Sequence, residues 1–319
     1  MRKILIFSFV IILSSKLFAS EGAIDILKGG MGPRATAMGG AFNSISETIY
    51  APCWNPAGIG DFSKIAVGSN YSSLISDISR FGILGTWPIF DGCFEGTILI
   101  ERISGAPLTT VGDDDRPNLQ GTFSDTKWVL ALTYARQIFL QGLLLGGSFK
   151  FHSHSLSSAS GSGIGFDLGA IDYPFANETD KGPLSVGLTI RNPLNTKIKW
   201  SSGNVDTISR EIVLGASYRG KLLDRQYILS GDFSYGSSKN ICAGAEFWIT
   251  EMLPVRLGIN KDRNLTFGTG LKLDQLDFDI SYFNHADLGS TYQFAFSYDF
   301  SNSNETQKTK EPHKIIKTP

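Results

Sequence analysis

The 319-residue sequence predicts an antiparallel transmembrane β-barrel. Three observations lead to this prediction: segments that alternate between apolar and polar residues recur along most of the chain, charged residues keep to one of the two alternating faces, and the chain begins with an export signal. Alternation with a period of two gives a strand one apolar and one polar face. A soluble β-sandwich or β-helix also alternates, but in a membrane barrel the apolar face contacts lipid and the polar face lines the lumen.

Residues 1–20 resemble a cleaved signal peptide. Arg2 and Lys3 form a basic start, and the apolar stretch Ile4–Leu13 is interrupted only by Ser8. This stretch is too short to cross a bilayer as a helix, which needs about 20 residues. Small residues at Ala19 and Ser20 suit a cleavage site. We therefore expect an exported protein of the bacterial outer membrane, with an uncleaved anchor or a core helix as the alternative.

Residues 21–63 are rich in glycine, alanine and proline and do not alternate. The stretch is too apolar for a free linker, and it carries no strand pattern. We predict that it forms a small hatch inside or under the barrel, with the Asn55-Pro56-Ala57 turn near the lumen axis. Arg34 would then pair with a lumen carboxylate, for which Glu95, Glu211 and Glu246 are the candidates.

Residues 64–300 contain the repeated alternating segments and are assigned to the barrel. We expect about fourteen strands, at 65–71, 81–87, 94–103, 127–135, 143–152, 164–171, 184–191, 211–219, 227–235, 241–249, 255–260, 265–273, 276–283 and 292–300. Three of the four longest stretches without alternation, 104–126, 153–163 and 192–210, follow odd-numbered strands, and the exception is the twelve-residue connection 172–183. These three are therefore expected as irregular loops at the external end of the barrel, where barrels keep their longer loops.

The charges within these strands are sorted onto one face. A Lys or Arg on the lipid-facing side at mid-membrane costs ~2–4 kcal/mol, so the charged face must be the lumen side. The residues predicted to face the lumen are Glu95, Glu101, Lys127, Lys150, Asp167, Glu211, Asp232, Glu246, Arg256, Lys272, Asp277 and Asp279.

Residues 301–319 are polar and lysine-rich, and we expect a disordered periplasmic tail. Cleavage of residues 1–20 would leave 26 basic against 30 acidic residues, because only Arg2, Lys3 and Lys16 are lost. The resulting net charge of −4 does not favour a nucleic-acid partner. Outer-membrane lipid is the expected environment. Cys53, Cys93 and Cys242 are far apart and odd in number, so we expect neither a disulfide framework nor a metal set from them.

No catalytic, cofactor or metal site is predicted. His152 and His154 have the spacing of metal ligands, but no third ligand is placed beside them. Asp113-Asp114-Asp115 lacks the spaced ligands of an EF-hand, so a solvated charge run is the favoured interpretation. The serines belong to no recognisable nucleophile motif, and we expect a protein that is not an enzyme.

The N-terminal segment carries a family resemblance. Gly32, Arg34 and Ala37-Met38-Gly39-Gly40-Ala41-Phe42 are followed by Trp54-Asn55-Pro56-Ala57-Gly58. These runs resemble the signature of the FadL-like outer-membrane superfamily, most closely its PorV/PorQ branch. The similarity extends to the last strands, at Leu253–Gly258 and Phe267–Gly270. Two departures are a single acid at Glu47 where the family has an acidic pair, and the 19 residues that follow Phe300.

The resemblance implies a fourteen-stranded barrel whose lumen is closed by an N-terminal hatch. Its hatch and gating residues would be Arg34, Met38, Gly39, Gly40, Trp54, Asn55, Pro56, Ala57 and Gly58. The implied function is passage of hydrophobic small molecules across the outer membrane, captured in an apolar pocket near the external rim. The alternative that it implies is a component of a protein-secretion or surface-assembly system, with secreted proteins as its clients.

Overall fold

A computed structural model describes residues 25–74, 78–111, 116–138, 142–177, 180–285 and 289–300. The predicted signal peptide, the tail and the three aspartates at 113–115 lie outside these residues. Within them, no helix is long and apolar enough to cross a membrane.

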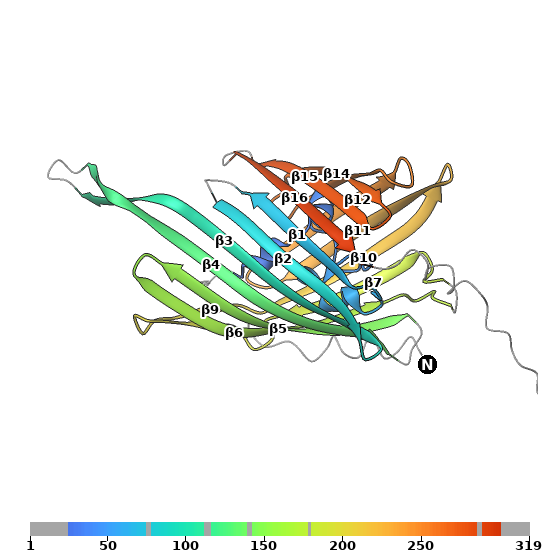
Figure 1. The fold of residues 1–319 in the computed structure, drawn as a ribbon, viewed down its shortest axis with the longest axis horizontal. Helices are drawn as coiled ribbons and strands as arrows, with labels where there is room; N and C mark the ends of the chain where they lie inside the picture. Colours follow the sequence, from blue (N-terminus) through green and yellow to red (C-terminus); the bar gives the residue numbers. More distant parts are fainter. Residues whose placement is uncertain are drawn as a thin grey trace, which may run out of the picture.

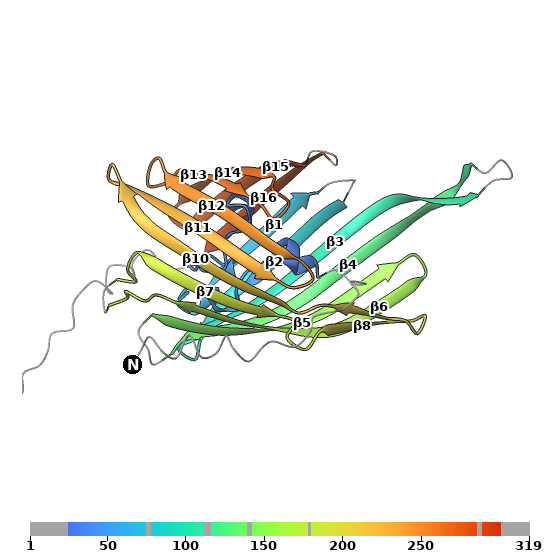
Figure 2. The same ribbon diagram turned by 180° about the vertical axis from the view of Figure 1, so that it is seen from behind.

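Fourteen strands close into an antiparallel barrel, which confirms the predicted fold (Figures 1 and 2). Neighbouring strands pair in chain order, β7 pairs with β10, and the pairing of β1 with β16 closes the ring. The strands are β1 (Ala66–Ser73), β2 (Ile78–Ile89), β3 (Gly92–Val111), β4 (Pro117–Gln137), β5 (Leu143–Leu156), β6 (Ala159–Asp172), β7 (Leu184–Arg191), β10 (Glu211–Leu222), β11 (Arg225–Tyr235), β12 (Lys239–Trp248), β13 (Pro254–Ile259), β14 (Leu265–Leu273), β15 (Leu276–His285) and β16 (Gly289–Asp299).

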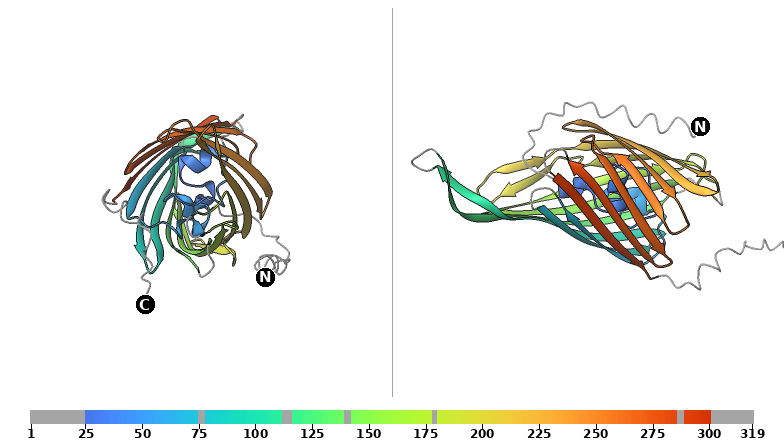
Figure 3. Two further views of the ribbon diagram at one scale, coloured as in Figure 1. Left: turned by 90° about the vertical axis from the view of Figure 1, so that its right-hand side faces the viewer. Right: turned by 90° about the horizontal axis from the view of Figure 1, so that it is seen from above.

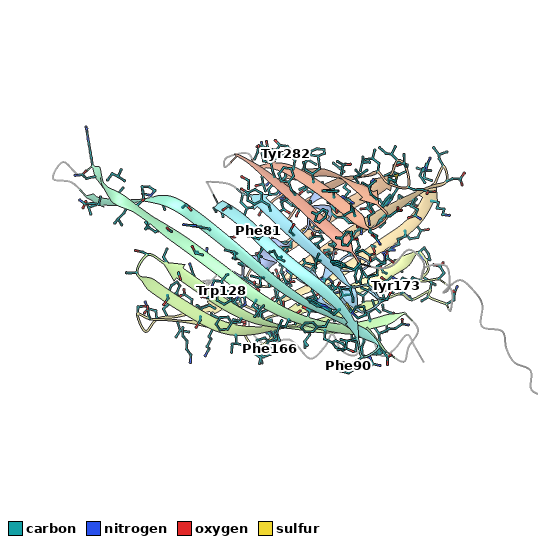
Figure 4. The ribbon with its side chains drawn as sticks, viewed as in Figure 1. Phe81, Phe90, Trp128, Phe166, Tyr173 and Tyr282 are labelled. Atoms are coloured by element: carbon teal, nitrogen blue, oxygen red, sulfur yellow. The ribbon has the colours of Figure 1, made fainter. Side chains whose placement is uncertain are left out.

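The outer face of the barrel is apolar, as the alternation predicts. Leu257 and Phe294 are exposed on it, and so are the aromatic residues Phe81, Trp128 and Phe166 that Figure 4 labels. The inner face is mostly polar but also carries buried apolar side chains, among them Leu84 on β2, Leu144 on β5 and Ile171 on β6. On β3 and β4, Leu99 and Val129 point inward and are buried against the chain inside the lumen.

The predicted loop over 104–126 is wrong, because β3 and β4 continue through most of it. The two strands stay paired as far as Val111 and Pro117, with register shifts after Ile103 and after Leu108. Their ends project beyond the other strands (Figure 1). Outside the membrane a strand pair needs no separation of lipid-facing and lumen-facing side chains, so these residues show no alternation. Likewise, 153–163 is not a loop, since β5 and β6 pair up to Leu156 and Ala159.

The predicted loop over 192–210 contains a further hairpin, β8 (Thr196–Trp200) and β9 (Val205–Ile208). It extends the wall beside β6, where Gly161 pairs with Trp200 and Ser162 with Lys199. Glycine is required on β6, because a Cβ at Gly163 would collide with the backbone of Lys197. The two strands have only five and four residues, which is too short for a recognisable alternation.

Residues 25–63, called the N-terminal segment here, lie inside the barrel (Figure 3, left). The segment contains the helix α2 (Pro33–Ala37) and three 3-10 turns, η2 (Ile26–Gly29), η3 (Ala51–Cys53) and η4 (Pro56–Ile59). Pro33 occupies the first position of α2, where its missing N–H costs nothing. The helix ends before Gly39 and Gly40, both with positive φ. Its short helices and turns let this segment follow the curved inner wall.

Candidate functional site: the lumen and its N-terminal segment

A buried network of four charges joins α2 to the wall. Arg34 donates two hydrogen bonds to Glu246, from Nε at 2.8 Å and from Nη2 at 2.7 Å. Arg256 donates to Glu246 at 2.6 Å and to Asp279 at 2.5 Å. Two cations therefore balance two anions. Of the three predicted partners of Arg34, the structure selects Glu246 on β12.

A second buried cluster holds the beginning of the segment. Lys150 on β5 lies 2.7 Å from the Oδ2 of Asp25 and 2.8 Å from the Oδ1 of Asp167 on β6. Asn192 donates a further hydrogen bond to Asp25 at 3.3 Å. The side chains of Lys150 and Asp25 are almost completely buried. Both wall residues were predicted to face the lumen, whereas Asp25 carries no local motif and was not predicted to take part.

The middle of the segment is held through its backbone. Asp232 on β11 accepts hydrogen bonds from the N–H groups of Phe42 and Asn43, both at 2.9 Å. The Asn43 side chain donates to the Val213 carbonyl on β10 at 3.1 Å. Asp232 was predicted to face the lumen, but Asn43 was not expected to take part. A carboxylate such as that of Asp232 can accept a hydrogen bond from the backbone N–H of any residue type except proline. No side-chain pattern in the sequence therefore indicates its partner.

The Asn55-Pro56-Ala57 turn lies against the wall, and its predicted place near the lumen axis is wrong. Asn55 donates to the carbonyls of Asn43 at 2.7 Å and of Ala170 on β6 at 3.1 Å. Its Oδ1 accepts from the Ala57 N–H at 3.0 Å, which caps η4. The turn reaches the wall because β5 carries Gly146, where a Cβ would lie 2.5 Å from the Pro56 backbone.

Inward-facing glycines continue along the wall as a band. A Cβ at Gly187, Gly244 or Gly258 would collide with the backbone of the N-terminal segment, at Asn43, Met38 and Gly39 respectively. Close backbone approach is a recognised reason for glycine in a strand. The wall is therefore shaped to the main chain of this segment.

The other residues of the predicted hatch signature lie within the segment. Met38 is fully buried, and Gly58 packs under Ala51. Trp54 donates its indole N–H to the Met31 carbonyl at 2.9 Å, and its ring centroid lies 6.3 Å from that of Phe42. These contacts stabilise the fold of the segment itself.

The remaining predicted lumen charges are also on the inner side, mostly in pairs. Glu101 binds Arg80 and Lys127, Glu211 binds Arg191, and Lys272 lies 3.3 Å from Asp277 near the rim. Glu95 is buried and accepts a hydrogen bond from Thr97 at 2.6 Å. The lumen charges thus serve chiefly to pair with one another and with the N-terminal segment.

The single acid of the signature, Glu47, lies at the end of the barrel near the start of β1. Lys181 and Arg219 bind its two carboxylate oxygens at 2.8 and 2.7 Å. Burial alone would raise the pKa of Glu47, but the two cations outweigh it and lower the pKa to about 2. Lys181 also pairs with Asp61, so this cluster joins two later parts of the segment, at Glu47 and Asp61, to the rim.

Two cavities lie on either side of the N-terminal segment. The first, which we call the vestibule, has a volume of about 260 Å³ and a floor of Gly39, Gly40 and Trp54. The second, near Glu47 and Asp61 at the other end, has about 340 Å³. A third void beside Glu95 has about 10 Å³, the space of a single water molecule. The vestibule and the opposite cavity are thus separated by the segment.

The vestibule is less apolar than the predicted capture pocket. Its apolar lining residues are Trp54, Leu74, Val213, Cys242 and Phe283. Its charged ones are Arg80, Arg191, Glu211, Asp232, Lys261 and Asp262. Two of these cations are engaged by neighbouring carboxylates, since Arg80 pairs with Glu101 and Arg191 with Glu211. The vestibule therefore sets apolar side chains beside charged ones, of which Arg191 and Asp232 also contact the N-terminal segment at its floor.

The two histidines of the sequence analysis do not come together at a metal site. His154 bonds Asp125 at 2.7 Å and lies beside the Trp200 ring, whereas His152 is buried on β5. Among the described residues, no group of three or more His, Cys, Asp and Glu side chains could hold a metal ion.

Comparison with known proteins finds similarity in structure alone. No protein-family profile matches the sequence, and no curated protein matches it. The fold resembles the CymD monoaromatic hydrocarbon channel, with a TM-score of 0.58 at 11% identity over 88% of this chain and all of that one. A mutant of the TodX monoaromatic hydrocarbon channel gives 0.56 at 12% identity, over 86% and 99% of the two chains.

A FadL homologue of Pseudomonas aeruginosa gives a TM-score of 0.51 at 11% identity, over 88% of this chain and all of that one. At these identities the likeness concerns the fold. It supports the FadL-like architecture that the N-terminal residues indicate, and it does not distinguish the branch.

Proposed function

We propose that this protein resides in the bacterial outer membrane and passes hydrophobic small molecules across it, with the N-terminal segment as a movable plug. The observation that carries the proposal is the filled lumen. The segment occupies the space between the vestibule and the opposite cavity and is held to the wall by buried ion pairs and backbone contacts. A lumen filled in this way leaves no open water channel, so passage along the lumen requires the segment to shift.

The vestibule supplies a place for capture. An apolar molecule entering from the end that carries the β3–β4 hairpin would meet the Trp54 ring at the floor, with Val213 and Phe283 in the walls. Burial of apolar surface against these side chains provides the favourable free energy, at about 25 cal/mol per Å². Two of the structural neighbours are described as monoaromatic hydrocarbon channels, which makes a small aromatic hydrocarbon the first substrate to test.

Uptake into cells tests this proposal. The protein would be expressed in an outer-membrane bacterium that lacks other hydrocarbon channels, and entry of radiolabelled toluene would be compared with entry of a radiolabelled pentose. We expect faster entry of toluene and unchanged entry of the sugar. Equal acceleration of both would indicate an open pore, and acceleration of neither would favour the secretion role that the resemblance also implies.

A further inference from the structure

The projecting ends of β3 and β4 form a two-stranded ribbon, residues 104–111 and 117–123, with which no other described strand pairs. β2 begins at Ile78, which pairs with Ile103, and β5 ends at Leu156, which pairs with Asp125. Beyond these positions the two strands pair only with each other among the described residues. At about 3.3 Å per residue, the ribbon extends about 25 Å past its neighbours.

Both edges of this ribbon expose backbone hydrogen-bonding groups. Exposed edges in natural sheets are usually protected by charged side chains. The ribbon sequences SGAPLTTV and PNLQGTF contain no charged residue, and their protection is limited to Pro107, Pro117 and the two register shifts. Leu108 and Leu119 are 49% and 65% exposed. An isolated pair of strands is marginally stable in water, and a third strand would stabilise it.

The geometry points to an extended segment of another protein as the third strand. We propose that the ribbon binds an uncharged, extended polypeptide by β-strand addition, in which backbone hydrogen bonds supply the affinity. A second copy of this chain fits less well. Two copies in one membrane are related by an axis along the membrane normal, so like edges would run parallel in a sheet that is otherwise antiparallel throughout. This inference is independent of the proposed passage function.

The test uses the full protein in nanodiscs and a short peptide of alternating Thr and Val. N-methylation of alternate residues blocks one edge of this peptide and leaves free N–H groups on the other edge. A control peptide is methylated at every residue and has no free edge. Amide hydrogen exchange of 104–110 and 118–123 reports the binding. We expect saturable slowing of exchange with the first peptide and none with the control.

A ribbonless variant provides the second comparison. Ile103 and Asp125 are cross-strand partners, so replacement of 104–124 by Asn-Gly joins β3 and β4 at a short turn. Heat-modifiable migration on gels checks that this variant folds. Peptide binding should disappear in it. Equal binding by the variant or by the fully methylated peptide, or unchanged exchange in the intact protein, would overturn the proposal. If lipopolysaccharide micelles slow the amide exchange of the ribbon and the peptide does not, the ribbon binds the lipid surface and the proposal is overturned as well.

Discussion

At the scale of single residues, the lumen is organised by charge balance. Arg34 and Arg256 face Glu246 and Asp279, and Lys150 lies between Asp25 and Asp167. These side chains are mostly removed from water, where an unpaired charge is costly. Removal of one partner from a buried pair typically destabilises a protein more than the pair itself stabilises it.

Glu246 provides the sharpest residue-level test. Glu246→Gln keeps the side-chain shape but leaves Arg34 and Arg256 without their shared anion. We expect the free energy of unfolding to fall by about 3–5 kcal/mol, measured by urea titration in detergent. Lys272→Gln is the matched control, because its pair with Asp277 is about one-third exposed. That change should remain within about 1 kcal/mol. Equal effects of the two substitutions would contradict this interpretation of the network.

Glu47 predicts a dependence of stability on pH. Its pKa is lowered from 4.5 to about 2 in the folded protein, so the folded state binds fewer protons than the unfolded state between these values. The stabilisation is complete above about pH 4.5 and is lost as the pH falls toward 2. The midpoint of unfolding should therefore fall less steeply with decreasing pH, between pH 4.5 and about 2, in Glu47→Gln than in the natural protein. Parallel curves would show that the Glu47 cluster does not contribute.

At the scale of elements, the sequence predicts strands where the membrane imposes two chemically different faces. Leu276–His285 alternates between lipid and lumen, so Asp277 and Asp279 can be assigned to one face from the sequence. The outer part of β3 has water on both sides and no such pattern, which is why it was predicted as a loop. The β8–β9 hairpin escaped prediction because its strands are very short.

Two adjacent glycines on β5 distinguish an effect on the contact with the N-terminal segment from an effect on the strand. Gly146 faces the Pro56 backbone, whereas Gly147 faces outward, where the nearest atoms to an added Cβ lie at 3.7 and 3.8 Å. Gly146→Val should displace the segment and make it accessible to protease in folded protein. Gly147→Val should leave the digestion pattern unchanged. Equal protection of both variants would show that the segment does not depend on this glycine.

The lipid-facing surface gives a second test at the scale of strands. Leu257 is exposed on the outer face of β13. Leu257→Arg should make folding into lipid less favourable by ~2–4 kcal/mol, measured by refolding into vesicles at several urea concentrations. Asn240→Arg introduces the same side chain beside the water-accessible vestibule and should have little effect. A larger loss at Asn240 would reverse the assignment of the two faces.

At the scale of the whole molecule, the protein combines an apolar exterior with an interior that packs around its own N-terminal segment. Part of this arrangement is predictable: a glycine-rich stretch with Arg34 before a barrel with lumen carboxylates indicates a segment inside. The particular contacts are not. Asp232 and Asn43, or Lys150 and Asp25, are more than a hundred residues apart, and no local pattern relates them.

Tethering the N-terminal segment to the wall shows whether hydrophobic molecules pass only when this segment moves. The Thr36 hydroxyl of α2 donates to the Oε1 of Gln293 on β16 at 3.0 Å, so cysteines at these two positions lie within reach of a short bis-thiosulfonate reagent that reduction removes. Toluene uptake would be measured for the double variant Thr36→Cys and Gln293→Cys before and after reduction of the bridge. Uptake should stop in the bridged form and return on reduction. Undiminished uptake with the tether verified by mass spectrometry would contradict the proposed movement of the segment.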